Sequence, residues 1–504
     1  MLTRRTVLGV IGAALASRAG AAVATKGEAL PFSRAWLSDE AARLASMTYT
    51  PMAQVPKPWR DLTYDQYRSI WFNSQKALWA DSRRPAQVDF FHPGLYFPRP
   101  VEISTVTGGM AQKLAFDLSL FDKTDQFPAL PVDDTMGYSG FRLRAELETP
   151  DIFTEFMVFQ GASYFRAIAT GQNYGLSARG LALNTGDPAG EEFPEFTRFW
   201  LEAPEPGARM MTVHALLDGP STTGAYSFKI IPGAPTRVTV EAELHPRRPL
   251  DHVGLAPLTS MFLFDETNRN RFDDFRPAVH DSEGLMVWNG AGELLWRPLA
   301  NPNTLQVSSF VDENPRGFGL MQRSREPGAF ADLEAHYHRR PSLWITPGED
   351  WGRGAVRLVE IPAEKEIYDN IVAYWRPRDP LAPGTAHQFS YQMDWGGAPP
   401  RPRDVAPVVQ TRIGKGYDKT VPERIATVDF APHPAFEAGP EALTVHTSSN
   451  RAKVSPGILQ RNPGTGGLRL GFSFDSGDRP AELRAQLLRD GTAVSEVWLY
   501  RWTP

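Results

Sequence analysis

Strict alternation of apolar and polar residues is the feature that most constrains how this chain folds. In residues 236–244 an apolar side chain occupies every second position, and residues 388–395 repeat the pattern with Phe, Tyr, Met and Trp. A period of two places successive side chains on opposite faces of a strand, so that one face is buried and the other meets water. We therefore predict half-exposed antiparallel strands at both places.

Turn-forming residues divide the chain into short segments. Its 504 residues include 42 glycines and 44 prolines without a collagen-like period, which favours short strands joined by turns. Helical spacing of apolar residues predicts helices only near the N-terminus, at residues 33–47 and 64–79. From about residue 87 onward, a large β-sandwich is the leading architecture.

The length exceeds what one hydrophobic core usually supports, so we expect two domains. Residues 396–404 are rich in Gly and Pro and predict a linker, because proline lacks a donor and cannot continue a strand. The linker separates a large β-sandwich at residues 27–395 from residues 405–504. In that second part, alternation at 468–474, an Asp490-Gly491 turn and a strand at 497–502 predict a small immunoglobulin-like sandwich.

The first 22 residues have the features of an export signal. Arg4 and Arg5 precede a short apolar run, and small residues at positions 19–21 suit a signal peptidase. This pattern resembles a twin-arginine signal, with an ordinary secretory signal as the alternative. Both predict an exported protein, and the apolar run is too short for a transmembrane anchor of about 20 residues.

Charge and cysteine content exclude several classes of function. The formal net charge is −5, which disfavours nucleic acid because its phosphates must be neutralised by Lys and Arg. The chain has no cysteine, so thiolate metal sites and Cys nucleophiles are excluded. The histidines do not form a set of three or four ligands, and we predict no metal site and no cofactor.

Carboxylates are the remaining candidates for catalysis, because Gly-rich phosphate loops and the Gly-x-Ser-x-Gly motif are absent in usable form. Asp281 lies in a His-Asp-Ser run and Asp369 in a Tyr-Asp-Asn run, 88 residues apart. Aspartates at strand ends beside polar partners can be tuned to different pKa values, as glycoside cleavage requires. The alternative is that the Asp-Ser and Asp-Asn pairs only form turns or helix caps. The other Asp and Glu residues between positions 313 and 366 also remain candidates for the catalytic carboxylates.

Aromatic residues point toward sugar binding. The chain has 13 Trp, 14 Tyr and 29 Phe, and several, such as Trp351 and Trp375, adjoin polar or other aromatic residues. A ring beside a hydrogen-bonding group suits the apolar face and hydroxyl rim of glucose. For any single Trp, packing in the sandwich core is the alternative.

Several long runs resemble the family of periplasmic glucans biosynthesis proteins G and D. The likeness covers nearly the whole chain after the leader, and its main runs are residues 91–97, 161–166, 174–180, 254–264, 275–282, 296–302, 313–323 and 369–375.

The resemblance implies a large N-terminal, galactose-mutarotase-like β-sandwich joined to a smaller immunoglobulin-like one. It also implies a periplasmic role in making osmoregulated glucans, which are β-1,2-linked glucose chains extruded by an inner-membrane glucosyltransferase. Members resemble glycoside hydrolase family 186, whose activity is endo-cleavage of β-1,2-glucan with inversion at the anomeric carbon.

The resemblance also implies roles for particular residues. Asp369 matches the general acid, and Asp281 matches the general base, which draws a proton from water directly or through a relay of hydroxyls. The predicted substrate-binding residues are Tyr337, Glu366, His280, Trp351, Tyr368 and Trp375.

Two positions depart from the family pattern. Tyr368 stands where Asn is expected before the acid, and Glu283 stands where Asn is expected after the His-Asp-Ser run. A phenol and a carboxylate near the site would change how water reaches the sugar. Two alternatives to hydrolysis therefore stay open: an inverting transglycosylase that cyclises or branches the glucan, and a non-catalytic glucan-binding module that assists the glucosyltransferase.

Overall fold

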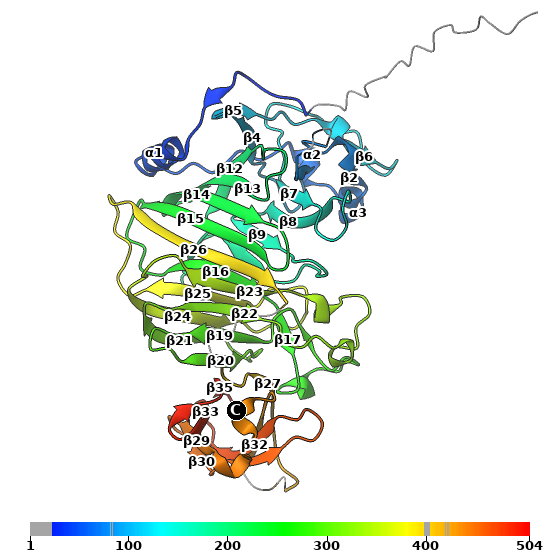
Figure 1. Ribbon diagram of the computed structural model, residues 1–504. Coiled ribbons are helices and arrows are strands. Elements are labelled where there is room, and N and C mark those ends of the chain that lie inside the picture. The colour runs from blue at the N-terminus through cyan, green and yellow to red at the C-terminus, as the bar shows by residue number, and fades with distance from the viewer. Residues whose placement is uncertain (1–22, 81, 83, 398–403, 419, 421–422) are drawn as a thin grey trace, which may run out of the picture.

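The computed structural model describes residues 23–504 except 81, 83, 398–403, 419 and 421–422. The predicted signal at residues 1–22 and most of the predicted linker lie outside the described residues, and the domain boundaries stay predictions. Strands dominate the described chain and stack as two large sheets, with a smaller β unit at the C-terminal end (Figure 1). The predicted all-β, sandwich-dominated fold class is confirmed.

The first sheet has sixteen strands and includes the strands predicted from alternation. Its order is β1 (Leu30–Pro31), β5 (Met110–Lys113), β4 (Glu102–Thr107), β12 (Glu195–Glu202), β13 (Met211–Asp218), β14 (Thr222–Ile231), β15 (Thr236–Pro246), β26 (His387–Gly396), β23 (Ser342–Pro347), β22 (Gly317–Met321), β19 (Gly284–Trp288), β20 (Leu294–Pro298), β35 (Val497–Trp502), β33 (Ala481–Arg489) and β29 (Thr444–Ser449), with β34 (Thr492–Ala493) beside β33.

The second sheet has ten strands and borders the candidate site. Its order is β21 (Gln306–Glu313), β24 (Arg353–Glu360), β25 (Ile371–Pro377), β16 (Val253–Ser260), β10 (Ser177–Arg179), β9 (Tyr164–Ala167), β8 (Thr154–Gln160), β7 (Gly140–Ala145) and β3 (Gln87–Phe91), with β11 (Ala182–Leu183) beside β16.

Three smaller sheets complete the β structure. They are the pair β17 (Phe262–Phe264) and β18 (Val279–His280), the pair β2 (Ile70–Phe72) and β6 (Phe121–Lys123), and a five-stranded sheet of β27 (Val408–Gly414), β28 (Arg424–Phe430), β32 (Leu468–Asp475), β30 (Lys453–Val454) and β31 (Ile458–Arg461).

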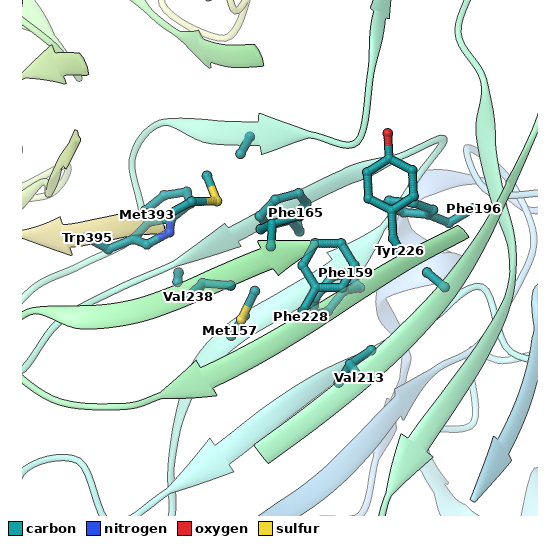
Figure 2. Close-up of a cluster of buried hydrophobic side chains, with 14 of the residues drawn as sticks. Met157, Phe159, Phe165, Phe196, Val213, Tyr226, Phe228, Val238, Met393 and Trp395 are labelled. Carbon is teal, nitrogen blue, oxygen red and sulfur yellow. The ribbon is translucent and has the colours of Figure 1, made fainter. Parts of the chain in front are cut away.

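The two predicted alternating strands pair with each other. Strand β15 runs antiparallel to β26, with Val238 opposite Met393 and Val240 opposite Tyr391. The apolar residues of both strands are buried, as the alternation predicted. Figure 2 shows Val238 and Met393 among side chains from the opposing strands β8 and β9, so the main core lies between the two large sheets.

Helices are confined to the N-terminal region of the described chain, as predicted. They are α1 (Arg34–Ala45), α2 (Lys57–Arg60) and α3 (Tyr64–Arg68), and single 3₁₀ turns cover Ser74–Lys76, Leu118–Leu120, Arg269–Arg271, Pro327–Ala329, Tyr337–Arg339, Pro434–Phe436 and Pro440–Ala442. Helix α1 begins at Ser33, whose hydroxyl accepts from the backbone N–H of Trp36 at 3.1 Å.

The predicted helix at residues 64–79 is wrong beyond its first turn. Thr63 and Gln66 form a capping box that starts α3, but the helix ends at Arg68 and the chain continues as β2. In β2, Ile70 and Phe72 are buried while Trp71 is exposed. This alternation is that of a strand, and β2 pairs with β6. Tertiary pairing therefore overrides the helical spacing.

The small C-terminal unit shares a sheet with the large sandwich. Strand β35 pairs in parallel with β20, with Leu295 opposite Val497 and Trp296 opposite Trp498. A single apolar cluster also contains side chains from both parts, including Trp296 and Trp344 from the large sandwich and Phe472 and Trp498 from the C-terminal unit. The two parts are therefore joined by backbone hydrogen bonds and by a common core.

The Asp490-Gly491 turn forms as predicted. It connects β33 to β34, and both of its residues have positive φ, 48° for Asp490 and 76° for Gly491, as a two-residue hairpin turn requires. Among the residues that the structure describes, no helix is long and apolar enough to cross a membrane.

Candidate active site

Asp281 and Asp369 are brought together by one short backbone segment, residues 260–262. Strand β25 pairs with the end of β16, and the N–H of Asn370 donates to the carbonyl of Ser260 at 3.0 Å. The N–H of Asp281 donates to the carbonyl of Met261 at 2.8 Å. Two aspartates 88 residues apart thus lie beside consecutive residues of the same segment.

The residues that follow the two aspartates fasten them to this segment. The buried amide of Asn370 accepts from the N–H of Phe262 at 2.8 Å and donates to the carbonyls of Phe262 at 2.9 Å and Ile361 at 3.1 Å. The hydroxyl of Ser260 donates to that of Ser282 at 2.8 Å. Asn370 and Ser282 therefore hold the two preceding aspartates in place.

The carboxyl group of Asp281 is buried and poorly hydrogen bonded. Its Oδ1 has no hydrogen-bond partner and lies 3.5 Å from Nε of Arg340. Burial, together with the negative charges of Asp369 and Glu366, raises the pKa of Asp281 to about 6, although Arg340 and Arg166 oppose the shift. The group therefore changes its charge near neutral pH.

Asp369 has a different environment. It keeps solvent-exposed surface, yet enough protein surrounds its carboxyl group that desolvation raises its pKa, against the opposing charges of Arg166 and Arg179. Arg179 is buried, donates to the hydroxyl of Thr259 at 2.9 Å and lies over the ring of Tyr164 at 4.9 Å. Strands β9 and β10 thus place two arginines beside Asp369.

These surroundings determine where a shared proton lies in the free site. Each carboxyl group faces two arginines, but Asp281 is the more buried of the two and also faces two like charges. The free site therefore favours the proton on Asp281, which is the reverse of the order that the resemblance implies. Two carboxyl groups that interact in this way titrate as a pair.

Glu366 and Tyr337, two of the predicted substrate-binding residues, lie beside Asp281. Oε2 of Glu366 is 2.7 Å from Nη2 of Arg276. Tyr337 is buried, and desolvation together with the negative charges of Glu366 and Asp281 raises its pKa, so its phenol stays neutral. Tyr368 is 56% exposed and directly precedes Asp369.

His280 lies behind the site. Nε2 of Gln322 donates to the carbonyls of His280 and Tyr337, each at 3.1 Å, so the Gln322 oxygen accepts from Nδ1 of His280 at 2.9 Å. Burial lowers the pKa of His280 to about 4, and its ring stacks on Phe262 with centroids 5.5 Å apart. A neutral, fully enclosed ring supports the Asp281 loop and leaves no face for a sugar.

The two predicted tryptophans lie elsewhere. Trp375 is fully buried in the core, four residues along β25 from Ile371, or about 14 Å at the usual strand rise. Trp351 is half-buried against it, with ring centroids 6.3 Å apart. The structure therefore does not bring either ring to the carboxyl pair.

The Glu283 side chain is hydrogen bonded to a segment that contacts the C-terminal unit. Its Oε2 accepts from the N–H groups of Arg323 at 3.1 Å and Ser324 at 3.0 Å, and burial raises its pKa. The guanidinium of Arg323 lies 3.5 Å above the Trp296 ring and forms a two-pronged ion pair with Glu496, at 2.7 and 2.8 Å. Of the two departures from the family pattern, only Tyr368 adjoins a catalytic candidate.

Sequence reasoning missed the arginines of the site. Arg166, Arg179 and Arg340 come from three separate segments and face the carboxyl pair, and Arg276 holds Glu366. A signal was present, since residues 161–166 and 174–180 were among the runs that carry the resemblance. Within the part of the chain that the structure describes, no group of three or more His, Asp or Glu side chains is arranged to hold a metal ion.

Comparison with known proteins finds relatives along nearly the whole chain. The family model described as "Periplasmic glucan biosynthesis protein, MdoG" matches residues 32–502. A glucans biosynthesis protein G from Vibrio cholerae serotype O1 is 48% identical over 467 residues, covering 92% of this chain and 85% of its own length. A protein of the same name from Bradyrhizobium diazoefficiens is 46% identical over 489 residues, covering 96% of both chains.

Proposed function

The chain belongs to the MdoG family of periplasmic glucan biosynthesis proteins, and from that premise we propose that it cleaves β-1,2-glucan chains as an inverting endo-β-1,2-glucanase. The substrate is the backbone of osmoregulated periplasmic glucans, supplied by the inner-membrane glucosyltransferase. The chain reaches the periplasm by the twin-arginine route, on the strength of Arg4 and Arg5.

The observation that carries this proposal is the carboxyl pair Asp281 and Asp369, held on one segment in unlike surroundings. Asp369 donates its proton to the glycosidic oxygen as the bond from that oxygen to the anomeric carbon breaks. A water attacks the same carbon from the opposite face, and its proton passes to Asp281, directly or through water and sugar hydroxyls. The product has the inverted configuration.

Glucan binding supplies the proton order that this reaction needs. Asp281 is already buried, so a bound sugar removes little further water from it. Asp369 retains exposed surface, and a sugar covering it adds desolvation, which raises the pKa of Asp369 further. Substrate thus favours a protonated Asp369 and leaves Asp281 as the base.

The alkaline side of the pH profile follows from the pKa of Asp281, which is about 6. Above this pH the free enzyme loses the one proton that the two carboxyl groups share, so Asp369 has none to donate and kcat/KM is expected to fall about tenfold per pH unit. Rates measured from about pH 4 to about pH 8 check this, and a flat profile through about pH 6 would contradict the role of Asp281. Asp281→Asn, which cannot ionise, serves as the control, because this limb of its residual rate should then follow the pKa of Asp369 alone.

A second candidate activity is inverting transfer of the glucan to a sugar hydroxyl, which cyclises or branches the chain. Tyr368 favours it, since its exposed ring beside Asp369 offers an apolar surface for an acceptor sugar where the family pattern has Asn.

Product analysis separates the candidates. The protein is incubated with linear β-1,2-glucan, and the products are separated by chromatography and weighed by mass spectrometry. Shorter linear chains indicate hydrolysis, and products lighter by one water than linear chains of the same length indicate cyclisation. Unchanged glucan that nevertheless binds would replace the proposal with a non-catalytic binding module, and β-1,3- and β-1,4-glucans serve as control substrates that should stay intact.

A further inference from the structure

We infer that exposed apolar side chains on three loops beside the carboxyl pair form a binding platform for glucan units outside the cleaved linkage. This inference rests on the proposed function. The loop platform consists of Phe275, Leu333, Ile367 and Tyr368.

The four side chains are unusually exposed for their type. Phe275 is 79% exposed, Leu333 83%, Ile367 75% and Tyr368 56%. Single apolar residues on a surface need no explanation, but a group gathered at one place marks a binding surface. Their positions relative to one another therefore decide whether they form such a group.

One arginine gathers the three loops. The guanidinium of Arg276 lies 2.8 Å from Asp274, 2.9 Å from Asp332 and 2.7 Å from Glu366. The side chain of Arg276 is only 13% exposed and that of Asp332 10%, so this pair lies largely below the surface, while Asp274 and Glu366 are 21% and 36% exposed.

Each loop contributes an apolar neighbour of this ionic cluster. Phe275 adjoins Arg276 in sequence, Leu333 adjoins Asp332, and Ile367 adjoins Glu366. The Phe275 ring centre is 5.9 Å from the Arg276 guanidinium. The ion pairs thus hold the loops from beneath, and the apolar side chains remain at the solvent side.

The loop platform is continuous with the candidate active site. Glu366, which belongs to the ionic cluster, is close enough to raise the pKa of Asp281. Tyr368, at the other end of the same short loop, directly precedes Asp369. A chain bound across the two aspartates therefore meets the platform within its next units.

The chemistry of the surface matches a glucose polymer. A pyranose ring has apolar C–H faces bordered by hydroxyls, so it packs on an apolar side chain while its rim hydrogen bonds to neighbouring polar groups. Here the apolar side chains alternate in sequence with the carboxylates of Asp332 and Glu366 and the guanidinium of Arg276. A neutral polyol uses both kinds of group, and the cluster of one guanidinium and three carboxylates has an excess of negative charge that disfavours an anionic ligand.

The test compares binding of long and short sugars. Calorimetry uses Asp369→Asn as the background, so that turnover is strongly slowed, with a linear β-1,2-glucan polymer and a β-1,2-linked trisaccharide as probes. Phe275→Ala is expected to weaken polymer binding about tenfold, and Phe275→Ala/Leu333→Asn/Ile367→Asn about a hundredfold, with the trisaccharide little affected. Ile458→Asn, at a 67% exposed position of β31 in the C-terminal unit, is the matched control and should leave both affinities unchanged.

Each of the following results would overturn the loop platform. Equal polymer affinity in the triple variant and the control would overturn the platform while leaving the proposed function intact. Equal weakening of both sugars would also overturn it, because the loops then serve only the carboxyl pair. A change of molecular mass in light scattering on triple substitution without sugar would reassign the surface to contact between copies of the chain. Failure of the background protein to bind either sugar would overturn the proposed function as well.

Discussion

Asp369→Asn is expected to lower turnover of β-1,2-glucan by about 10²–10⁴-fold while glucan binding is largely retained. The amide keeps the size of the carboxyl group and its place after Tyr368, but it cannot donate an acidic proton to the leaving oxygen. The loss should therefore appear in kcat, with KM little changed. Initial rates of product formation and calorimetry with the same glucan measure the two effects.

The matched control for this variant is Asp379→Asn. Asp379 follows the far end of β25, and its side chain is 75% exposed in an ion pair with Arg378. Its replacement should leave turnover unchanged. Normal turnover by Asp369→Asn would remove the general-acid assignment, and a rise in KM with unchanged kcat would reduce Asp369 to a binding residue.

Glu496→Ala is expected to cost about 3–5 kcal/mol of unfolding free energy, because it leaves the Arg323 guanidinium buried without its partner. The Glu496 side chain is only 3% exposed and also accepts from the N–H of Val408 at 2.8 Å. Equilibrium denaturation by urea measures the change, provided that unfolding is two-state.

An exposed ion pair provides the comparison. Glu313 pairs with Arg353, with both side chains at least 60% exposed, and Glu313→Ala should cost no more than about 1 kcal/mol. Replacing both Arg323 and Glu496 with Met should restore much of the stability lost in Glu496→Ala, since the buried ion pair is then removed as a whole. Equal costs for Glu496→Ala and Glu313→Ala would contradict the importance of burial here.

Strand positions could be predicted from sequence wherever one face of a strand is buried. Residues 236–244 and 388–395 alternate because β15 and β26 each present one face to the core, and both predictions are confirmed. The helix prediction for residues 64–79 was wrong because the apolar residues of a short segment can fit both the helical period and the strand period. Pairing of β2 with β6, about 50 residues later, decided between them.

The candidate site was only partly predictable. Composition alone gave Asp281 and Asp369 as turn residues, and the family resemblance singled them out. Trp375 satisfied the rule of an aromatic beside a polar group, yet its place in an inner strand buries it, and sequence does not reveal which rings face a cleft. Arg340 and Arg166 meet Asp281 only through tertiary folding, so the run that contains Arg166 carried the resemblance without revealing this contact.

The pairing of β20 with β35 bears on how such a protein can change over evolutionary time. A domain joined only by a linker can be lost, duplicated or exchanged as a cassette. Here removal of the last hundred residues would take away one of the two strands hydrogen bonded to β20 and expose the apolar side chains of Trp296 and Trp344. An unpaired, apolar strand edge of this kind promotes aggregation. The C-terminal unit and the large sandwich are therefore expected to be inherited together, with substitutions on one side of their junction matched by substitutions on the other.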